Sequence, residues 1–488
     1  MRWPSGPLEI ALREKAGRLT RDAAETLRKW HDPSTLALLE GTPVSCLLVG
    51  WSSGLPADSE QQQTLKPLIE RGRKAGLSFV GLIERGADQT AAIAAAKAAG
   101  LSAVVTVATE KDTSAGNSSL PVIPATKSAE AQWDAATPVL AVTDGLWPRV
   151  QTARGSDMVG GPTGLPWVES NGAFLSIAHV LAPAKTVWLA LELPKDTQIL
   201  TAEAYMVALA DSAVYGGRWV ITLDDQLRGG LAARNAGAIA TWKKITRTLA
   251  FFEQRKEITT YPSGGLLGVI SSFAGPDREL GEEVLNLLPR RRLPFRAIAK
   301  SQAWNASFNG LDAAYYVDRE PPDPRLRQKL IAFARGGGVL FVPAEWPNPE
   351  GSPAKAEPYF VFNLRALGQG RVAVAKEENL DPDEVASDIH AIMSHRRDLL
   401  RLFNATAMNC SYKVVPGGGR AVVQLLNYTG RPSQPAALWI MKGHYRSARF
   451  TSPETASPVT LELTPRENGG VEMILPLMPV CGVIELAS

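Results

Sequence analysis

Apolar runs of strand length alternate with amphipathic stretches of helix length through the first half of the chain. Apolar strands that alternate with helices are typical of a parallel sheet with both faces covered. Seven or eight such units over about 220 residues predict an α/β fold, a (β/α)8 TIM-like barrel. The expected strands are 44–51, 78–84, 102–107, 120–124, 139–143, 187–193 and 219–224, with a weaker one near 258–262, and the expected helices are 60–76, 90–100, 127–135, 171–182, 201–214 and 228–254.

The pattern changes twice in the second half. After Tyr261 a shorter alternation of strands and helices predicts a small doubly wound α/β domain. The last 80 or so residues carry short strand-like runs separated by turns and no helix, which predicts a β-sandwich. The expected domains are the barrel with an N-terminal helical segment at 1–262, the α/β domain at 263–380, a linker helix at 381–407 and the β-sandwich at 408–488.

Three of the apolar runs in the expected barrel end in carboxylates, at Asp144, at Glu192 and at Asp224-Asp225. The carboxyl ends of barrel strands meet at one rim, so these groups are expected to face one pocket. Paired carboxylates at such a rim suit glycoside cleavage, one as acid and the other as base or nucleophile. Glu192 and Asp225 are the preferred pair. Successive strand residues face opposite ways, so one of Asp224 and Asp225 is expected at the site and the other as a helix cap.

The stretch 145–170 is rich in Gly and Pro and lacks periodicity, as functional loops often do. It carries Trp147, Trp167 and Glu169. We expect it to fold over the barrel mouth, with the indoles as a stacking wall and Glu169 assisting catalysis. The alternative is that one of these rings simply plugs the rim of the barrel.

Three further residues are candidates for substrate binding. Asp144 precedes Gly145 and Trp147, a combination that suits a sugar subsite and equally suits an Asp-Gly turn. Asn171 lies beside the predicted loop, where it or Ser170 also suits a helix cap. Trp51 ends the first expected strand and is a further stacking candidate.

Composition excludes several classes of partner and cofactor. The formal net charge of +3 is nearly balanced and does not indicate a nucleic-acid-binding surface. No apolar run approaches the roughly 18–20 residues of a membrane span. The three cysteines form no C-x-x-C pair, and neither a metal-binding box nor a phosphate-binding loop is present. We therefore expect no metal and no cofactor. The first four residues lack the apolar core of a secretory signal, which indicates a cytoplasmic protein unless a signal was removed from a secreted or periplasmic one.

The order of domains resembles the multi-domain β-galactosidases, in which an amidotransferase-like trimerisation domain follows the barrel and a β-sandwich ends the chain. The resemblance is carried by Leu311-Asp-Ala-Ala-Tyr-Tyr-Val317, by Leu326 to Leu330 on a helix, and by Arg335-Gly-Gly-Gly-Val-Leu-Phe-Val342. It implies a middle domain without amidotransferase chemistry, in keeping with the lack of any cysteine between Cys46 and Cys410. The family's acid/base signature, an Asn-Glu pair after the fourth barrel strand, is absent, and the fourth expected strand ends in Pro124-Ala-Thr126.

The sequence thus predicts a glycoside hydrolase that acts on an oligosaccharide or glycoconjugate. The alternative is a non-catalytic carbohydrate-binding or assembly protein on a glycosidase-like frame, which the missing Asn-Glu pair favours. The resemblance also implies a homo-oligomer formed through residues 263–345.

Overall fold

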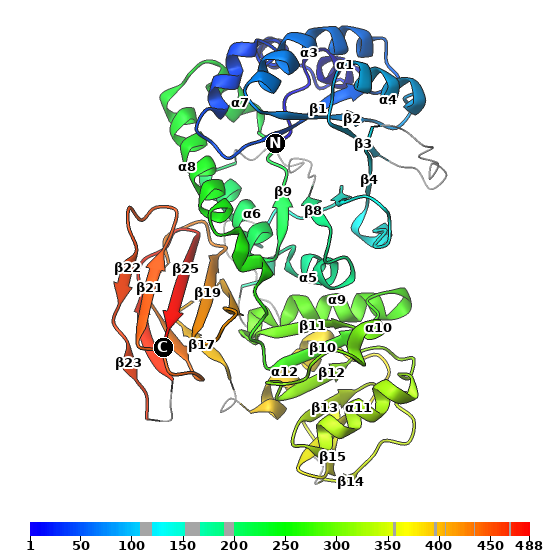
Figure 1. Cartoon of the computed structure of the whole chain (residues 1–488), viewed down its shortest axis with the longest axis vertical. Coiled ribbons are helices and arrows are strands. Elements are labelled where there is room, and N and C mark those ends of the chain that lie inside the picture. The colour runs from blue at the N-terminus through cyan, green and yellow to red at the C-terminus, as the bar shows by residue number, and fades with distance from the viewer. Residues whose placement is uncertain are drawn as a thin grey trace. The chain divides into compact units, whose positions relative to one another are not determined.

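The computed structural model describes residues 1–107, 120–151, 166–189, 200–354, 358–394, 398–405, 407–433, 435–467 and 470–488. The chain forms two compact units (Figure 1). The first unit comprises Met1–Trp147 and Ala184–Gln254, and the second comprises Pro148–Pro183 and Arg255–Ser488.

A curled sheet of seven parallel strands forms the centre of the first unit, in the order β1-β2-β3-β4-β5-β8-β9. One face packs inward, where Leu48, Val80, Ala141 and Val220 share a single apolar cluster. The opposite face meets the helices, and Phe79, for example, lies against Gly72 of α3. Burial on both faces explains why these strands are apolar throughout. The strands are β1 (Cys46–Ser52), β2 (Ser78–Ile83), β3 (Ala103–Val107), β4 (Val122–Thr126), β5 (Val139–Val142), β8 (Thr186–Leu189) and β9 (Gly217–Trp219).

The first three residues join the two edges of this sheet. The backbone N–H of Arg2 donates to the carbonyl of Ile221 at 2.8 Å, and that of Trp3 donates to Leu48 at 2.8 Å. Arg2 pairs with Leu48 in the parallel sense. The segment therefore serves as an eighth strand, and the arrangement is consistent with a TIM-like barrel. The strand expected near 258–262 is wrong, because Lys256–Thr260 form a short 3₁₀ helix, η3.

Helices cover the outer face of the first unit, several of them capped by the residue that precedes them. Thr201 caps α6 and Asp88 caps α4, each by accepting a hydrogen bond from a backbone N–H in the first helical turn. The helix expected over 127–135 is reduced to η2 (Ser128–Glu130). The helical elements are α1 (Gly6–Lys15), α2 (Arg21–Lys29), η1 (Pro33–Leu39), α3 (Ala57–Lys74), α4 (Gln89–Ala98), α6 (Ala202–Val214), α7 (Asp225–Ala232) and α8 (Ala236–Glu253).

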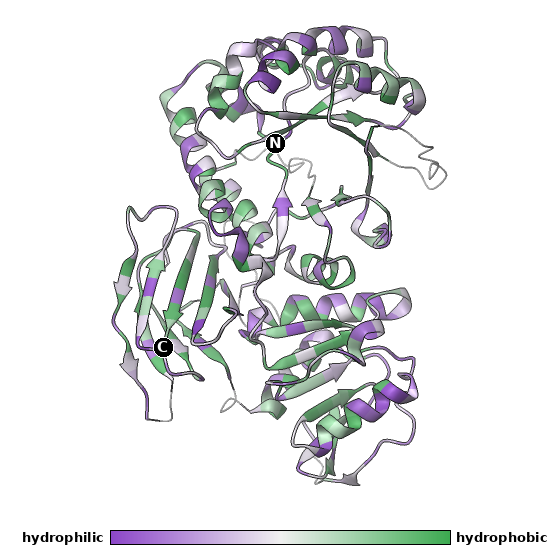
Figure 2. Ribbon diagram, in the orientation of Figure 1, coloured by the Kyte–Doolittle hydropathy of each residue, from purple (hydrophilic) through white to green (hydrophobic). Residues whose placement is uncertain are grey.

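The second unit contains a seven-stranded sheet in the order β11-β10-β12-β13-β16-β15-β14. Its first five strands are parallel, and β15 and β14 are antiparallel. Figure 2 shows the central strands as mostly hydrophobic and α11 as amphipathic. Tyr316, Leu340 and Val372 of the sheet pack on Leu326 and Leu330 of that helix. The strands are β10 (Leu267–Ser271), β11 (Phe295–Ala299), β12 (Ala313–Tyr316), β13 (Val339–Val342), β14 (Ser352–Pro353), β15 (Phe362–Leu367) and β16 (Gly370–Ala375).

The helices of this sheet include one from an earlier part of the chain. Helix α5 (Gly172–Leu181), which the sequence pattern groups with the barrel, contacts α9 and β11 of the second unit. The expected linker helix ends early, at Met393 of α12, and a strand begins at Leu400. The remaining helical elements are η4 (Gly275–Asp277), α9 (Arg278–Leu287), η5 (Pro289–Arg291), α10 (Lys300–Ala303), α11 (Pro324–Arg335) and α12 (Pro382–Met393).

Two antiparallel sheets end the chain. One has the order β17-β20-β24-β23 and the other β18-β19-β25-β21-β22. Alternate residues of β20 are buried, as expected for a strand with one covered face. The strands are β17 (Leu400–Phe403), β18 (Met408–Val414), β19 (Arg420–Asn427), β20 (Ala436–Ile440), β21 (Ser447–Thr451), β22 (Val459–Leu461), β23 (Thr464–Pro465), β24 (Val471–Leu475) and β25 (Cys481–Ala487).

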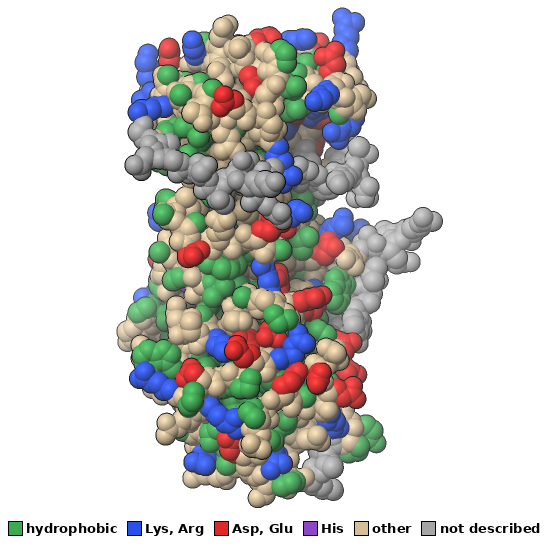
Figure 3. Space-filling view, turned by 90° about the vertical axis from the view of Figure 1, so that its right-hand side faces the viewer, with side chains coloured by type: hydrophobic (Ala, Val, Ile, Leu, Met, Phe, Trp, Pro, Cys, Tyr) green, Lys and Arg blue, Asp and Glu red, His purple; other side chains and the backbone are tan. Residues whose placement is uncertain are grey.

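Figure 3 shows acidic and basic side chains interspersed over one face of the molecule. Within the described ranges, no helix is both long enough and apolar enough to cross a lipid bilayer.

Candidate functional site

Asp224 follows the last strand of the barrel and caps α7. Its Oδ1 accepts a hydrogen bond from the backbone N–H of Leu227 at 2.9 Å. Its Oδ2 accepts the hydroxyl proton of Tyr205 at 2.8 Å, and the same phenol oxygen accepts from the backbone N–H of Asp224. Burial and the adjacent carboxylate raise the pKa of Tyr205 far above its usual range, so the phenol stays a neutral donor. These bonds orient a carboxylate that remains only half-buried.

Asp225, the preferred partner of Glu192 in the sequence, is held in an ion pair instead. Its two oxygens accept from both terminal nitrogens of Arg13, at 2.6 and 2.8 Å. The hydrogen bond from Arg13 lowers the pKa of Asp225, against the opposing effect of partial burial. Arg13 also pairs with Glu9, and Arg228 does the same at 2.6 Å. Asp225 therefore connects α7 to α1, which favours a structural role for it.

Glu84 is a strand-end carboxylate that the sequence analysis missed. It follows β2, and its backbone N–H continues the sheet pairing by donating to Ser52 at 2.8 Å. It lies in the same alternation phase as Val80 and Leu82, which line the inner cluster. Its carboxylate is 3.9 Å from the guanidinium of Arg2 and its side chain is 31% exposed. The apolar run of β2 ends in an acid just as the other runs do, so the same rule could have found it.

Asp144 and Trp147 are engaged within the first unit. Asp144 accepts from the backbone N–H and the hydroxyl of Ser128, at 2.7 and 2.9 Å, and so fixes the η2 turn. The indole of Trp147 packs edge-to-face on Tyr205 and Trp219, with centroid separations of 5.5 and 4.9 Å. These contacts match the alternative in which the indole plugs the rim.

Trp51 cannot serve as a stacking platform. Its side chain is 1% exposed, and its indole N–H donates to the carbonyl of Ala92 in α4 at 2.9 Å. The residue shares the outward phase of Leu47 and Val49, so it packs beneath the helices rather than at the barrel mouth.

Trp167, Glu169 and Asn171 belong to the second unit. Glu169 lies on β7 (Val168–Glu169), which pairs with β6 (Arg149–Val150), and it accepts from Arg149 at 2.8 Å. The guanidinium of Arg290 lies 3.6 Å from the ring centroid of Trp167. Asn171 is 5% exposed. Its neighbour Ser170, through a hydroxyl that accepts from Gly172, supports the start of α5.

The candidates thus divide between the two units. Trp51, Asp144, Trp147, Asp224 and Asp225 lie in the first. Glu192 and the middle of the 145–170 loop fall outside the described residues. Within the described parts of the chain, no group of three or more His, Cys, Asp or Glu side chains is arranged to hold a metal ion.

No protein-family model matches the sequence, and neither does any curated protein. The structure is similar to that of α-L-fucosidase isoenzyme 2 from Paenibacillus thiaminolyticus, with a TM-score of 0.59 and 9% identity over 94% of this chain and 96% of that one. The β-galactosidase from Bacillus circulans sp. alkalophilus gives a TM-score of 0.44 and 9% identity over 89% of this chain and 68% of that one. The exo-β-1,4-mannosidase Op5Man5 from Opitutaceae bacterium strain TAV5 gives a TM-score of 0.38 and 11% identity over 75% of this chain and 90% of that one. The chain therefore shares the fold of this α-L-fucosidase.

Proposed function

We propose that this protein is a glycoside hydrolase that acts on an oligosaccharide or glycoconjugate at the carboxyl ends of its barrel strands. The observation that carries the proposal is the fold shared with an α-L-fucosidase over nearly the whole of both chains. Barrel enzymes place their catalytic groups at this end of the strands. No cofactor enters the proposed reaction, because carboxylates alone supply the acid and the base or nucleophile of glycoside cleavage.

Glu192 and Asp224 are the proposed catalytic pair, with Asp224 replacing Asp225. Glu192 follows β8 in sequence and Asp224 follows β9, and these two strands are parallel neighbours. Groups that follow neighbouring parallel strands emerge at the same rim. Asp224 is better suited than Asp225 because its hydrogen bonds orient it from inside the fold, whereas Arg13 neutralises Asp225.

The eighth strand formed by residues 1–3 also changes the strand count on which the family signature depends. With that segment counted first, the fourth barrel strand is β3 rather than β4. The sequence after β3 continues with Ala108-Thr109-Glu110, outside the described residues. That stretch also lacks the Asn-Glu pair of the family.

The second candidate function is a non-catalytic carbohydrate-binding protein on the same frame. It is favoured by one observation, that three strand-end carboxylates in the described part of the barrel are engaged in hydrogen bonds within the fold. Asp144 accepts from Ser128, Asp224 accepts from Tyr205 and Leu227, and Asp225 accepts from Arg13. In either function, the 263–345 region is proposed to mediate self-association, which light scattering before and after its deletion would test.

A panel of aryl glycosides and of polysaccharides separates the two candidates. The enzyme should release the aryl group from at least one glycoside, and Glu192→Gln should reduce that rate more than 1000-fold with the unfolding free energy kept within about 1 kcal/mol. Glu130→Gln, a change of an exposed carboxylate on η2, is the matched control and should keep full activity. Binding of a polysaccharide without any hydrolysis would establish the second candidate instead. Full activity in Glu192→Gln would remove Glu192 from the site.

A further inference from the structure

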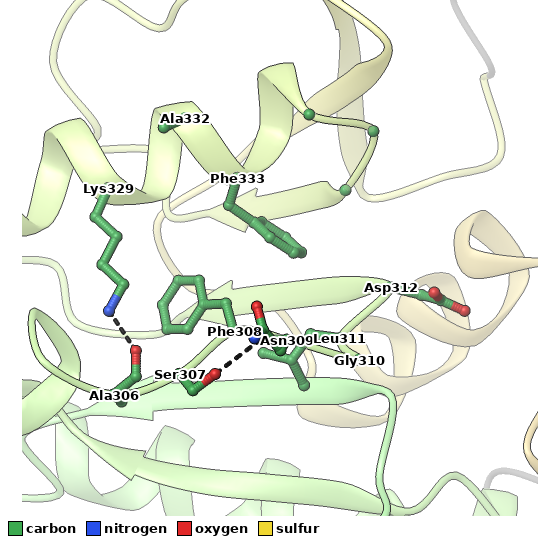
Figure 4. Close-up of a pocket in the computed structure, with 13 residues that line it drawn as sticks. Ala306, Ser307, Phe308, Asn309, Gly310, Leu311, Asp312, Lys329, Ala332 and Phe333 are labelled. Carbon is green, nitrogen blue, oxygen red and sulfur yellow. Dashed lines mark hydrogen bonds between the residues drawn. The ribbon is translucent and has the colours of Figure 1, made fainter.

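A pocket of about 780 Å³ lies in the second unit, at the amino-terminal ends of β12 and β13. One wall is the loop 306–312, which connects α10 to β12, and the other is the last part of α11 with the glycine turn 336–338 (Figure 4). This volume is within the range that small-molecule sites occupy. None of the residues proposed above for the barrel reaction lines it.

Two aromatic rings provide the apolar part of the lining. Phe308 from the loop and Phe333 from α11 meet edge-to-face, with centroids 5.6 Å apart (Figure 4). Both rings are only partly buried. A Cβ atom at position 338 would lie 2.3 Å from the ring of Phe333, so Gly338 is required for that ring to lie where it does. The fold thus holds a partly exposed aromatic pair in place inside a concave surface.

Apart from Lys329, the polar side chains of the lining are neutral or acidic. Ser307 and Asn309 lie on the loop, where the backbone N–H of Asn309 donates to the Ser307 hydroxyl at 3.2 Å. Asp312 ends the same loop and accepts from Lys442 at 2.8 Å. Hydroxyl and amide groups near an aromatic ring are suited to a sugar, whose hydroxyls bond the polar groups while its apolar face packs on the ring.

The ammonium group of Lys329, which also lines the pocket, already has hydrogen-bond partners within the protein. It donates to the carbonyls of Ala303 and Trp304, both at 3.0 Å, and to that of Ala306. An ammonium group has three protons to donate, and all three are used within the protein. A phosphate or sulfate would therefore find no free donor on this lysine, and the carboxylate of Asp312 is paired with Lys442. The lysine thus gives no reason to favour an anion over a neutral ligand.

We propose that this pocket is a second carbohydrate-binding site, separate from the barrel, which takes a neutral saccharide against Phe308 and Phe333. The choice of a saccharide rests partly on the proposed function, but the residues are independent of the barrel.

Photo-crosslinking locates the binding directly. The full chain is irradiated with galactosides, fucosides, mannosides and glucosides that carry an aryl diazirine, and labelled peptides are identified by mass spectrometry. We expect at least one of these probes to label peptides from 306–312 or 329–338, and excess methyl glycoside to remove that label. The sugar-free aryl diazirine should label these peptides at least tenfold less.

Two variants of the pocket and one matched control make the test decisive. Ala332→Trp fills the pocket from an exposed position of α11 and should reduce labelling of the pocket peptides at least tenfold. Asn309→Ala should reduce labelling by the sugar probes and leave labelling by the sugar-free probe unchanged. Gln328→Trp adds the same bulk at an exposed position of α11 outside the pocket and should change nothing. Glu192→Gln should leave the pocket label intact.

Labelling that Ala332→Trp leaves unchanged, or that inorganic phosphate displaces better than a methyl glycoside, would overturn the proposal. So would sugar-dependent labelling confined to barrel peptides, an outcome that leaves the proposed function standing. Pocket labelling in a protein that hydrolyses no glycoside would uphold this site and contradict the proposed enzyme.

Discussion

Asp224 and Asp318 each follow a buried segment of a parallel sheet. Asp224 lies in the first unit and Asp318 in the second, and their surroundings differ. Asp318 comes after β12 with its side chain 2% exposed. It accepts from the Ser271 hydroxyl at 2.6 Å and from the backbone N–H of Ser272 at 3.0 Å, and Lys300 lies 3.4 Å away. Asp224 is half-buried and, among the described residues, bonds Tyr205 and the first turn of α7.

This difference shows what a carboxylate at a strand end can and cannot indicate. A buried carboxylate must be paired and hydrogen-bonded, since burial of an isolated charge is very unfavourable. Asp318 meets that requirement entirely within its own unit, so it stabilises the sheet. Asp224 is oriented but still accessible, which is the combination that a reacting group needs. A position after a strand makes both residues candidates for a reacting group. Their exposed fractions and hydrogen-bond partners are what distinguish them.

Within this comparison of the two units, the largest effect is expected from Asp224→Asn. If Asp224 belongs to the proposed catalytic pair, kcat/KM for any hydrolysed aryl glycoside should fall at least 100-fold, a change of about 3 kcal/mol in the barrier. The unfolding free energy should change by less than about 1 kcal/mol, because Asn is as good a helix cap as Asp. Steady-state kinetics and urea unfolding measure the two quantities. Unchanged kinetics would place Asp224 with Asp318 as a structural residue.

Asp318→Ala should reduce the unfolding free energy by about 3 kcal/mol. The change leaves Ser271 and Ser272 without an acceptor and removes the buried partner of Lys300. Urea or thermal unfolding measures the loss. The control is Glu320→Ala, which removes the 83% exposed partner of the same lysine and should have an effect below about 1 kcal/mol. Equal effects of the two substitutions would contradict the distinction drawn here.

Glu9 is a half-buried carboxylate of the first unit that pairs with two arginines, Arg13 and Arg228. Burial opposes its ionisation, but Arg228 and Arg13 outweigh that effect and lower its pKa to about 2. A lowered carboxyl pKa contributes stability that is present above pH 4.5 and is lost as the pH falls toward 2. Glu9→Gln should therefore reduce the unfolding free energy by about 2–3 kcal/mol at pH 7 and by much less near pH 3.

Urea unfolding at both pH values measures this dependence. Glu14→Gln, an exposed change on the same helix, is the matched control and should have little effect at either pH. A loss in Glu9→Gln that is the same at both pH values would show that packing, not charge, accounts for it.

The smallest effect is expected from Asp225→Asn. The carboxylate is 56% exposed, so solvent screens its pair with Arg13, and the loss of stability should be below about 1 kcal/mol. Glycosidase activity should be retained. An activity loss as large as that of Asp224→Asn would restore Asp225 to the catalytic pair, as the sequence alone had suggested.

The sequence by itself determined the parallel strands of both sheets and the antiparallel end of the chain. Runs such as those of β1, β10 and β13 are apolar throughout because both faces of a parallel sheet are covered, and that requirement is visible in composition. It also indicated that acidic residues follow several of these runs. A strand as short as residues 1–3 has no readable periodicity, so the eighth strand was missed.

Only the tertiary structure decided which acidic residue does what. Alternation along a strand gives the phase of Asp224 and Asp225, but it does not reveal Arg13, which lies more than 200 positions away in the sequence. The same holds for Trp51, whose burial depends on Ala92, and for α5, which packs on α9 and β11. Local pattern fixes periodicity because it follows from backbone geometry, whereas partners come from distant parts of the chain that only folding brings together.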